Sequence, residues 1–276
     1  MPTIVTHLNP HLDEVVCIWM VRRFLPRWNR CTVKYVATNP HGGSVKATDR
    51  DSTIMYIGVG RGKFDEHKGN LDESATTLVY TFLVGEKKIK LATIERAALA
   101  ELVAFVNDDD HGKHITQLHS EFSFSTANAF MPRTGMKSAA ILTAGAAYLD
   151  GVFECLLEKH LLERDWKKMQ LVKTRVGRAV AVQTEASAKT VLRRASREGI
   201  QIAIVLNPKN KFRSIRAVPE SPADFSDAFQ RAHALEPHAE WYLHHSKKML
   251  ICGSDVAANV TLSKMSLAAL IQLVAV

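Results

Sequence analysis

The order of strand-like and helix-like segments along the first 106 residues constrains the fold most strongly. Short apolar runs, typical of buried strands, are followed by segments whose apolar residues recur at helical spacing. The expected strands cover residues 3–6, 31–36 and 53–59, and the expected helices cover 14–24, 73–82 and 93–106. This order predicts an α/β domain with a mostly parallel sheet flanked by helices.

The pattern changes beyond about residue 170, where short strands separated by turns predict a smaller α+β domain with a meander sheet. A long helical segment at 136–168, with a break near Gly151, precedes this change. We therefore predict two domains, 1–165 and 179–276, joined by a helical linker at 166–178.

The composition excludes several classes of protein. Of the 276 residues, 46% are hydrophobic and 23% are charged, a balance typical of a globular protein rather than a disordered chain. No apolar run reaches the roughly 18 residues of a membrane span, and no signal peptide is recognisable, so we expect a cytoplasmic protein. The four cysteines lie far apart without a CxxC pair, which excludes a zinc knuckle and favours reduced thiols.

The charge balance fits a polyanionic partner such as nucleic acid. Lys and Arg outnumber Asp and Glu by 36 to 28, which gives a net charge of +8. Many basic proteins bind no anion, so the charge alone does not decide the function. Aromatic residues make up 7% of the chain, which argues against an extended base-stacking platform.

Imidazole and carboxylate side chains gather directly after the first expected strand. His7 and His11 flank a short loop, and Asp13 and Glu14 begin the helix that follows. Open α/β sheets hold their sites at the carboxyl ends of strands, and such side chains can converge there on a divalent cation. The alternative is a helix N-cap formed by Asp13 beside two surface histidines.

Two further groups of acidic residues and histidines follow. Asp65, Glu66 and His67 come after the glycine-rich turn at 58–62, whose spacing is not that of a phosphate-binding P-loop. The acidic run at 108–110 follows the helix expected at 93–106, where carboxylates oppose the helix dipole and therefore favour a bound cation. Solvated charged loops are the alternative for both groups.

Taken in order, these motifs resemble those of the DHH phosphoesterase superfamily, and they are most similar to the melanocyte-proliferating-gene family of metal-dependent nucleases. The likeness rests on His-x-Asn-Pro-His-x-Asp, Phe-Asp-Glu-His and Asp-His-Gly in the first domain. Further matches lie at 73–80, 241–246 and 251–253. The resemblance spans most of the chain and implies a DHH-like catalytic domain followed by a DHH-associated domain that binds substrate.

The resemblance also implies a centre with two divalent cations, Mn or Mg. Its ligands would be His7, His11, Asp13, Asp65, Glu66, His67 and Asp110. Among these, His67 and Asp110 would also take part in catalysis, with either His67 or a metal-bound hydroxide handling the proton. The second domain would present substrate across a cleft, with phosphates held by Arg213, Arg216, His244, His245, Lys247 and Lys248.

Two residues depart from the superfamily pattern. Gly58 falls where a metal-bridging aspartate usually lies, and Glu66 replaces the first histidine of the Asp-His-His triplet. A glutamate still binds hard cations, whereas a glycine has no side-chain donor. Either Asp65 or the acidic run at 108–110 compensates, or one of the two metal positions is weak or empty. In the second case Gly58→Asp should strengthen metal binding if the backbone there does not need a positive φ.

The sequence thus predicts a metal-dependent phosphodiesterase or phosphatase acting on RNA ends, short oligonucleotides or a small phospho-nucleotide. A 3′-5′ exonuclease and a nucleotide phosphodiesterase are both open. The alternative is a degenerate DHH-like protein that binds nucleic acid without hydrolysing it. Neither function involves a membrane, and a homodimer stays open.

Overall fold

The structure is a computed structural model that describes residues 1–37, 45–48, 50–69, 72–257 and 259–275. The chain divides into two compact units, Met1–Leu156 and Leu157–Val276. The division falls inside one long helix, α5 (Ser138–Trp166), and not at the expected linker. Part of that linker forms strand β4 (Gln170–Thr174), so the prediction of a helix there was wrong.

The first unit is built on a small parallel sheet with the strand order β2-β1-β3. Its strands are β1 (Thr3–His7), β2 (Thr32–Val36) and β3 (Ile54–Tyr56). Thr3 pairs with Thr32 on one side and with Ile54 on the other, so β1 is the central strand. Its carboxyl end therefore lies at the middle of the sheet edge where α/β proteins hold their sites. The parallel sheet and the mixed α/β character confirm the predicted α/β class of the first domain.

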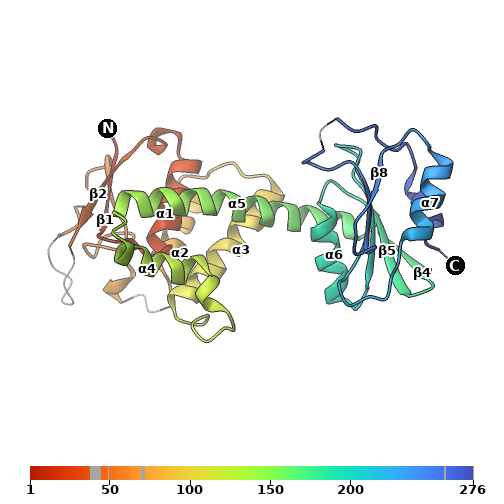
Figure 1. Ribbon diagram of the computed structural model, residues 1–276. Coiled ribbons are helices and arrows are strands. Elements are labelled where there is room, and N and C mark those ends of the chain that lie inside the picture. The colour runs from red at the N-terminus through yellow and green to blue at the C-terminus, as the bar shows by residue number, and fades with distance from the viewer. Residues whose placement is uncertain (38–44, 49, 70–71, 258, 276) are drawn as a thin grey trace. The chain divides into compact units, whose positions relative to one another are not determined.

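Helices of the first unit pack together beside this sheet (Figure 1). They are α1 (Leu12–Phe24), α2 (Ala75–Thr81), α3 (Thr93–Asp110), α4 (Phe124–Phe130) and the first part of α5. A π-helical turn, Phe82–Glu86, extends α2, and single 3-10 turns lie at Pro26–Trp28, Glu66–Lys68, Ser120–Phe122 and Met131–Thr134. Helix α3 extends beyond its expected end, so the acidic run at 108–110 forms its last turn.

Helix α5 is continuous, and the break expected near Gly151 is absent. Leu149 and Phe153, on either side of this glycine, are buried and anchor the helix in the first unit. Among the described residues, α5 is the one helix long and apolar enough to cross a membrane, a test that core helices of soluble proteins also pass.

Two glycines of α5 should respond in opposite ways to replacement by alanine. A Cβ at Gly145 would lie 2.5 Å from Val15 Cγ1, whereas a Cβ at Gly151 would meet nothing within 4 Å. Gly145→Ala is expected to lower the free energy of unfolding by about 1–3 kcal/mol through overpacking. Gly151→Ala should raise it by about 0.5–1 kcal/mol, because alanine is the better helix former. Urea denaturation measures both changes, and equal effects would contradict the packing of α5 on α1.

The second unit holds a mixed sheet with the order β4-β5-β6-β7-β9-β8, in which β5 and β6 are parallel neighbours and the other neighbouring pairs are antiparallel. After β4, its elements are β5 (Gly177–Gln183), α6 (Ala188–Arg197), β6 (Ile202–Leu206), β7 (Arg213–Ala217), α7 (Ser226–Leu235), β8 (Trp241–Leu243), β9 (Met249–Cys252) and α8 (Leu267–Gln272). Alternating strand residues enter two cores, one with α6 and the end of α5, the other with α7 and α8. Figure 1 shows α6 and α7 on opposite sides of this sheet.

Candidate metal centre

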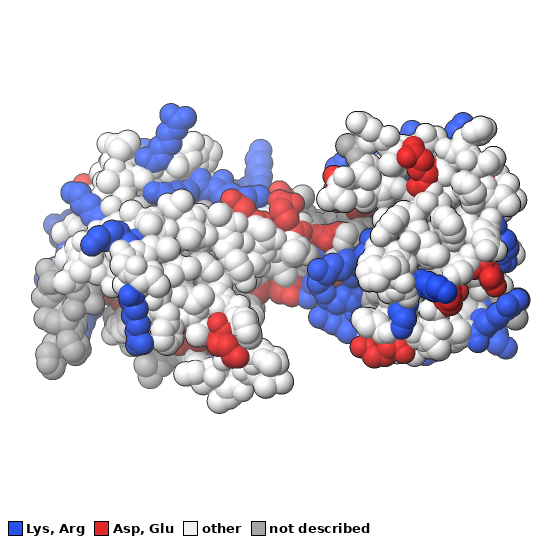
Figure 2. Space-filling model, viewed as in Figure 1, with Lys and Arg blue, Asp and Glu red and all other residues white. Residues whose placement is uncertain are grey.

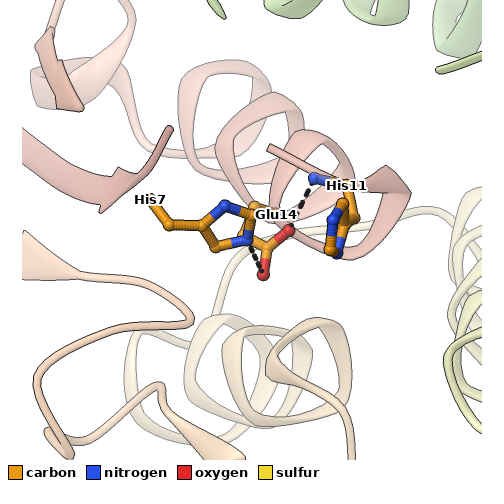
Figure 3. A group of neighbouring side chains, drawn as sticks. All are labelled: His7, His11 and Glu14. Carbon is orange, nitrogen blue, oxygen red and sulfur yellow. Dashed lines mark hydrogen bonds and ion pairs between the residues drawn. The ribbon is translucent and has the colours of Figure 1, made fainter. Parts of the chain in front are cut away.

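Two histidines and a glutamate meet at the carboxyl end of β1. His7 ends the strand, His11 directly precedes α1, and Glu14 lies in the first turn of that helix. Glu14 Oε1 is 3.0 Å from His7 Nε2, and Glu14 Oε2 accepts a hydrogen bond of 2.9 Å from the His11 backbone N–H (Figure 3). The two imidazole rings lie edge to face, with centroids 4.9 Å apart. Donor atoms of the three side chains lie within 4.8 Å of one another, close enough to share one ion.

This arrangement places opposite charges on His7 and Glu14. Burial disfavours the His7 imidazolium, but the hydrogen bond and ion pair with Glu14 outweigh burial and raise the pKa of His7 to about 9. Burial also disfavours the Glu14 carboxylate, yet His7 and His11 lower its pKa. His7 is therefore an imidazolium at neutral pH, and a cation that binds at its Nε2 would release a proton.

Asp13 is buried and organises the start of a second helix. Its carboxylate accepts hydrogen bonds from the backbone N–H groups of Ala75 (3.0 Å) and Thr76 (2.8 Å), the first residues of α2. Asp13 therefore caps α2, which corrects the alternative in which it caps its own helix. Burial and repulsion from Glu14 raise the pKa of Asp13 to about 7 despite these hydrogen bonds.

A second group joins Asp13 to Glu66 and Asp110. Glu66 lies in the 3-10 turn that follows β3, and Asp110 ends α3, so three elements supply this group. Glu66 Oε2 is buried and has no hydrogen-bond partner among the described residues. Burial and repulsion from other carboxylates, Glu14 among them, raise the pKa of both Glu66 and Asp110. A divalent cation would relieve this repulsion.

A third group, Asp65, Glu66 and His67, shares Glu66 with the second. The buried Asp65 carboxylate accepts hydrogen bonds from the Arg61 and His67 backbone N–H groups, at 2.6 and 3.2 Å. Its Oδ1 also lies 2.9 Å from His67 Nδ1. Burial opposes the His67 imidazolium, but Asp65 and Glu66 outweigh it and raise the pKa of His67. The His67 side chain is 71% exposed, so the ring that Asp65 contacts at Nδ1 is accessible to solvent.

The rest of the acidic run makes other contacts. Asp108 pairs with Lys113 at 2.6 Å, and Asp109 accepts a hydrogen bond from the Ser125 hydroxyl. The helix dipole led us to expect a bound cation at this acidic run. Of its three carboxylates, only that of Asp110 lies in a ligand group among the described residues.

A cavity of about 250 Å³ opens beside the second group. Its polar lining consists of His11, Asp13, Asp109, Asp110, Ser125 and Asn128. The buried Asn128 donates a hydrogen bond of 2.8 Å to the Pro10 carbonyl and so holds the loop between β1 and α1. Its Oδ1 has no partner among the described residues. No motif or apolar period marks Asn128 in the sequence, so it was not among the expected site residues.

The side chain of Glu14 occupies the space beside Gly58, the position where the superfamily usually has an aspartate. Gly58 follows β3 with a φ of +63°, and a Cβ at this position would lie 2.5 Å from Glu14 Oε1. Gly58→Asp in the parent chain would therefore be strained and would displace Glu14, which corrects the expectation of a simple gain in metal binding. Glu14 was missing from the expected ligands, although its place three residues after His11 puts both on one side of a helical turn.

Arg213 and Arg216 both lie on β7, but they face opposite sides of the sheet because strand side chains alternate with a period of two. Arg213 is buried on the side of Ile215, where its guanidinium donates to the Met265 carbonyl at 3.1 Å. Arg216 is half-buried on the other side and donates to Ser214 Oγ at 3.0 Å. The two arginines therefore do not form a single phosphate clamp.

The other four phosphate-binding candidates surround the turn between β8 and β9. The rings of His244 and His245 lie 3.9 Å apart, Lys247 forms an ion pair, and Lys248 donates to two backbone carbonyls. Contact of these residues with substrate stays a prediction.

Lys and Arg side chains also gather over α6 (Figure 2). Arg194 pairs with Glu163 at 2.9 Å and with Glu198 at 2.6 Å, and its guanidinium lies over the Trp166 ring. This arginine therefore packs α6 against the end of α5.

The donor set of the first unit suits a divalent cation such as Mg or Mn. Imidazole nitrogens and carboxylate oxygens near the ends of β1 and α3, the start of α1 and the 3-10 turn form three groups. Glu66 belongs to the second and third of them, and the neighbouring residues Asp13 and Glu14 link the first and second. Carboxylate oxygens outnumber imidazole nitrogens, a composition that hard cations prefer. The buried, unpartnered Glu66 Oε2 is a donor that such a cation would use.

No family model matches the chain, and no curated protein matches it. Among solved structures it is similar to RecJ from Thermus thermophilus, determined in complex with Mg2+. The match covers 92% of this chain and 47% of the RecJ chain, with 16% sequence identity and a TM-score of 0.29. The chain thus spans about half of RecJ, and a TM-score of this size does not establish a shared fold.

The charges at the centre predict how stability depends on pH. The pKa of His7 is raised from 6.5 to about 9, so its contribution is fully present below pH 6.5 and is lost as the pH rises to about 9. The metal-free protein should therefore lose thermal stability between these values. Mn should stabilise it most at the upper end, because cations bind the deprotonated ligands. Melting temperatures in EDTA and in Mn test this, and a metal-free Tm that rises over this range would contradict it.

Proposed function

We propose that this protein is a divalent-metal-dependent phosphodiesterase of the DHH type, acting on RNA ends, short oligonucleotides or a small phospho-nucleotide. The observation that carries the proposal is the pair of ligand groups, one of His7, His11 and Glu14, the other of Asp13, Glu66 and Asp110. Asp13 and Glu14 are adjacent in α1 yet belong to different groups. Two cations would therefore lie close together, as in two-metal phosphoesterases.

Cations held there would neutralise the charge that develops on a phosphoryl group during in-line attack by water. The chain supplies orientation and proton transfer. Asp65 holds the His67 ring at Nδ1, and the exposed ring can deliver a proton to the leaving oxygen. Asp110 belongs to the second ligand group and also lines the cavity, which gives the substrate room beside that group.

The second unit would hold substrate phosphates. Among the described residues, Arg216, His244 and His245 are the candidates whose side chains contact neither a charged partner nor a backbone carbonyl. We place the protein in the cytoplasm because its four cysteines are free thiols, which a reducing compartment preserves.

The competing function is nucleic-acid binding without hydrolysis, which the net charge of +8 and the departures at Gly58 and Glu66 favour. Hydrolysis assays over labelled RNA, DNA, dinucleotides and a nucleotide bisphosphate decide between the two. We expect at least one class to be cleaved in Mn and none in EDTA. Nucleic-acid binding with no cleavage and no response to Mn would favour the binding protein.

A further inference from the structure

Gly58, just after the end of β3, has no side chain at the point where the backbone approaches Glu14. Strand β3 pairs with β1, which ends at His7. Gly58 follows β3 and therefore lies at the same edge of the sheet as His7. A Cβ at Gly58 would lie 2.5 Å from Glu14 Oε1, 3.1 Å from its Cγ and 3.2 Å from its Cδ. The end of the Glu14 side chain thus fills the space that a side chain at position 58 would enter.

Glu14 reaches this space from another element and keeps contact with both histidines. Its side chain is 5% exposed, and its carboxylate touches His7 Nε2 and the His11 backbone N–H. Asp13, the residue before it, belongs to the second ligand group. Glu14 also repels the carboxylates of all three members of that group, Asp13, Glu66 and Asp110.

We infer that Glu14 is a metal ligand that substitutes for a carboxylate at position 58. The inference rests on the proposed metal centre and assigns to Glu14 the carboxylate ligand that Gly58 does not supply. The position expected to be weak because of Gly58 has a charged oxygen donor supplied by the first turn of α1. A side chain at position 58 would then shift that donor, because its Cβ would lie 2.5 Å from Glu14 Oε1.

Moving the carboxylate back to position 58 tests the inference. Glu14→Gln keeps the shape of the side chain but removes its charge, and it should weaken Mn binding by about 100-fold or more, above the loss typical of an outer-shell change. Glu14→Ala should do the same. Glu14→Ala combined with Gly58→Asp should bind Mn at least about tenfold more tightly than Glu14→Ala alone, since it returns a carboxylate to the centre and aspartate is enriched among the few residues found at positive φ.

The matched control combines Glu14→Ala with Gly58→Asn, which tolerates the same backbone but supplies no charge. Isothermal titration calorimetry with Mn gives affinity and stoichiometry, and circular dichroism compares the fold of all variants. Rescue by aspartate and not by asparagine supports the inference. Unchanged Mn binding in Glu14→Gln overturns it, as does an aspartate variant that folds like the asparagine control but binds no tighter. A parent that binds Mn while Glu14→Gln is unaffected leaves the proposed function intact, whereas a parent that binds no divalent cation refutes that function itself.

Discussion

Glu66→Gln is expected to abolish metal-dependent hydrolysis while leaving the fold intact. Glu66 belongs to the second and third ligand groups, and its buried Oε2 has no partner among the described residues. The substitution removes a charged donor at the point where two groups meet, so Mn affinity and kcat/KM should each fall by about 100-fold or more. Hydrolysis rates and calorimetry with Mn measure the two effects.

The thermal stability of metal-free Glu66→Gln should not fall, although its activity does. Repulsion and burial raise the pKa of Glu66 in the metal-free protein, so a neutral amide relieves both. The metal-free Tm of Glu66→Gln should equal or exceed that of the parent. A variant that loses activity because it unfolds would contradict a ligand role, and so would one that retains full activity.

Asp13→Ala is expected to be the most destabilising single change at the centre. It would leave the buried backbone N–H groups of Ala75 and Thr76 without an acceptor, at about 1–3 kcal/mol for each unsatisfied donor. The two donors together set a loss of about 2–6 kcal/mol in unfolding free energy, which is partly offset because the substitution also removes a buried carboxyl group that Glu14 repels. Urea denaturation in EDTA isolates this effect from metal binding.

The matched control is Asp108→Ala, since Asp108 belongs to the acidic run at the end of α3 but to no ligand group among the described residues. Its pairing with Lys113 is at the surface, so stability should not change measurably. Equal losses in the two variants would show that Asp13 does not act through α2.

Local pattern was enough to place the strands and helices around the sheet edge. Apolar period and order located β1, β2, β3 and α1 to within a few residues, because β1, β3 and α1 bury apolar residues and β2 alternates exposed and half-buried residues at its start. Strand β4 was missed because its residues are mostly exposed and polar, so its structure depends on pairing with β5. The continuity of α5 through Gly151 likewise depends on buried neighbours that the sequence does not reveal.

Topology explains which site residues could be found from the sequence. His7 ends β1, Asp13 lies in the helix that follows it, and Glu66 comes after β3, so strand order predicts these residues at one edge of the sheet. The structure places Asp13 and Glu66 in one ligand group and His7 in another. Two features depend on contacts between distant segments. Asp13 caps a helix that begins 62 residues later, and Glu14 fills the space beside Gly58.

Calorimetric titration of the EDTA-treated parent protein with Mn at neutral pH tests the two-cation centre most directly. Two ions should bind per chain, with release of protons from His7 and Asp13 and a rise in Tm. Proton release is measured by repeating the titration in buffers of different ionisation enthalpy. Absence of binding, with a Tm that Mn leaves unchanged, would contradict the two-cation centre.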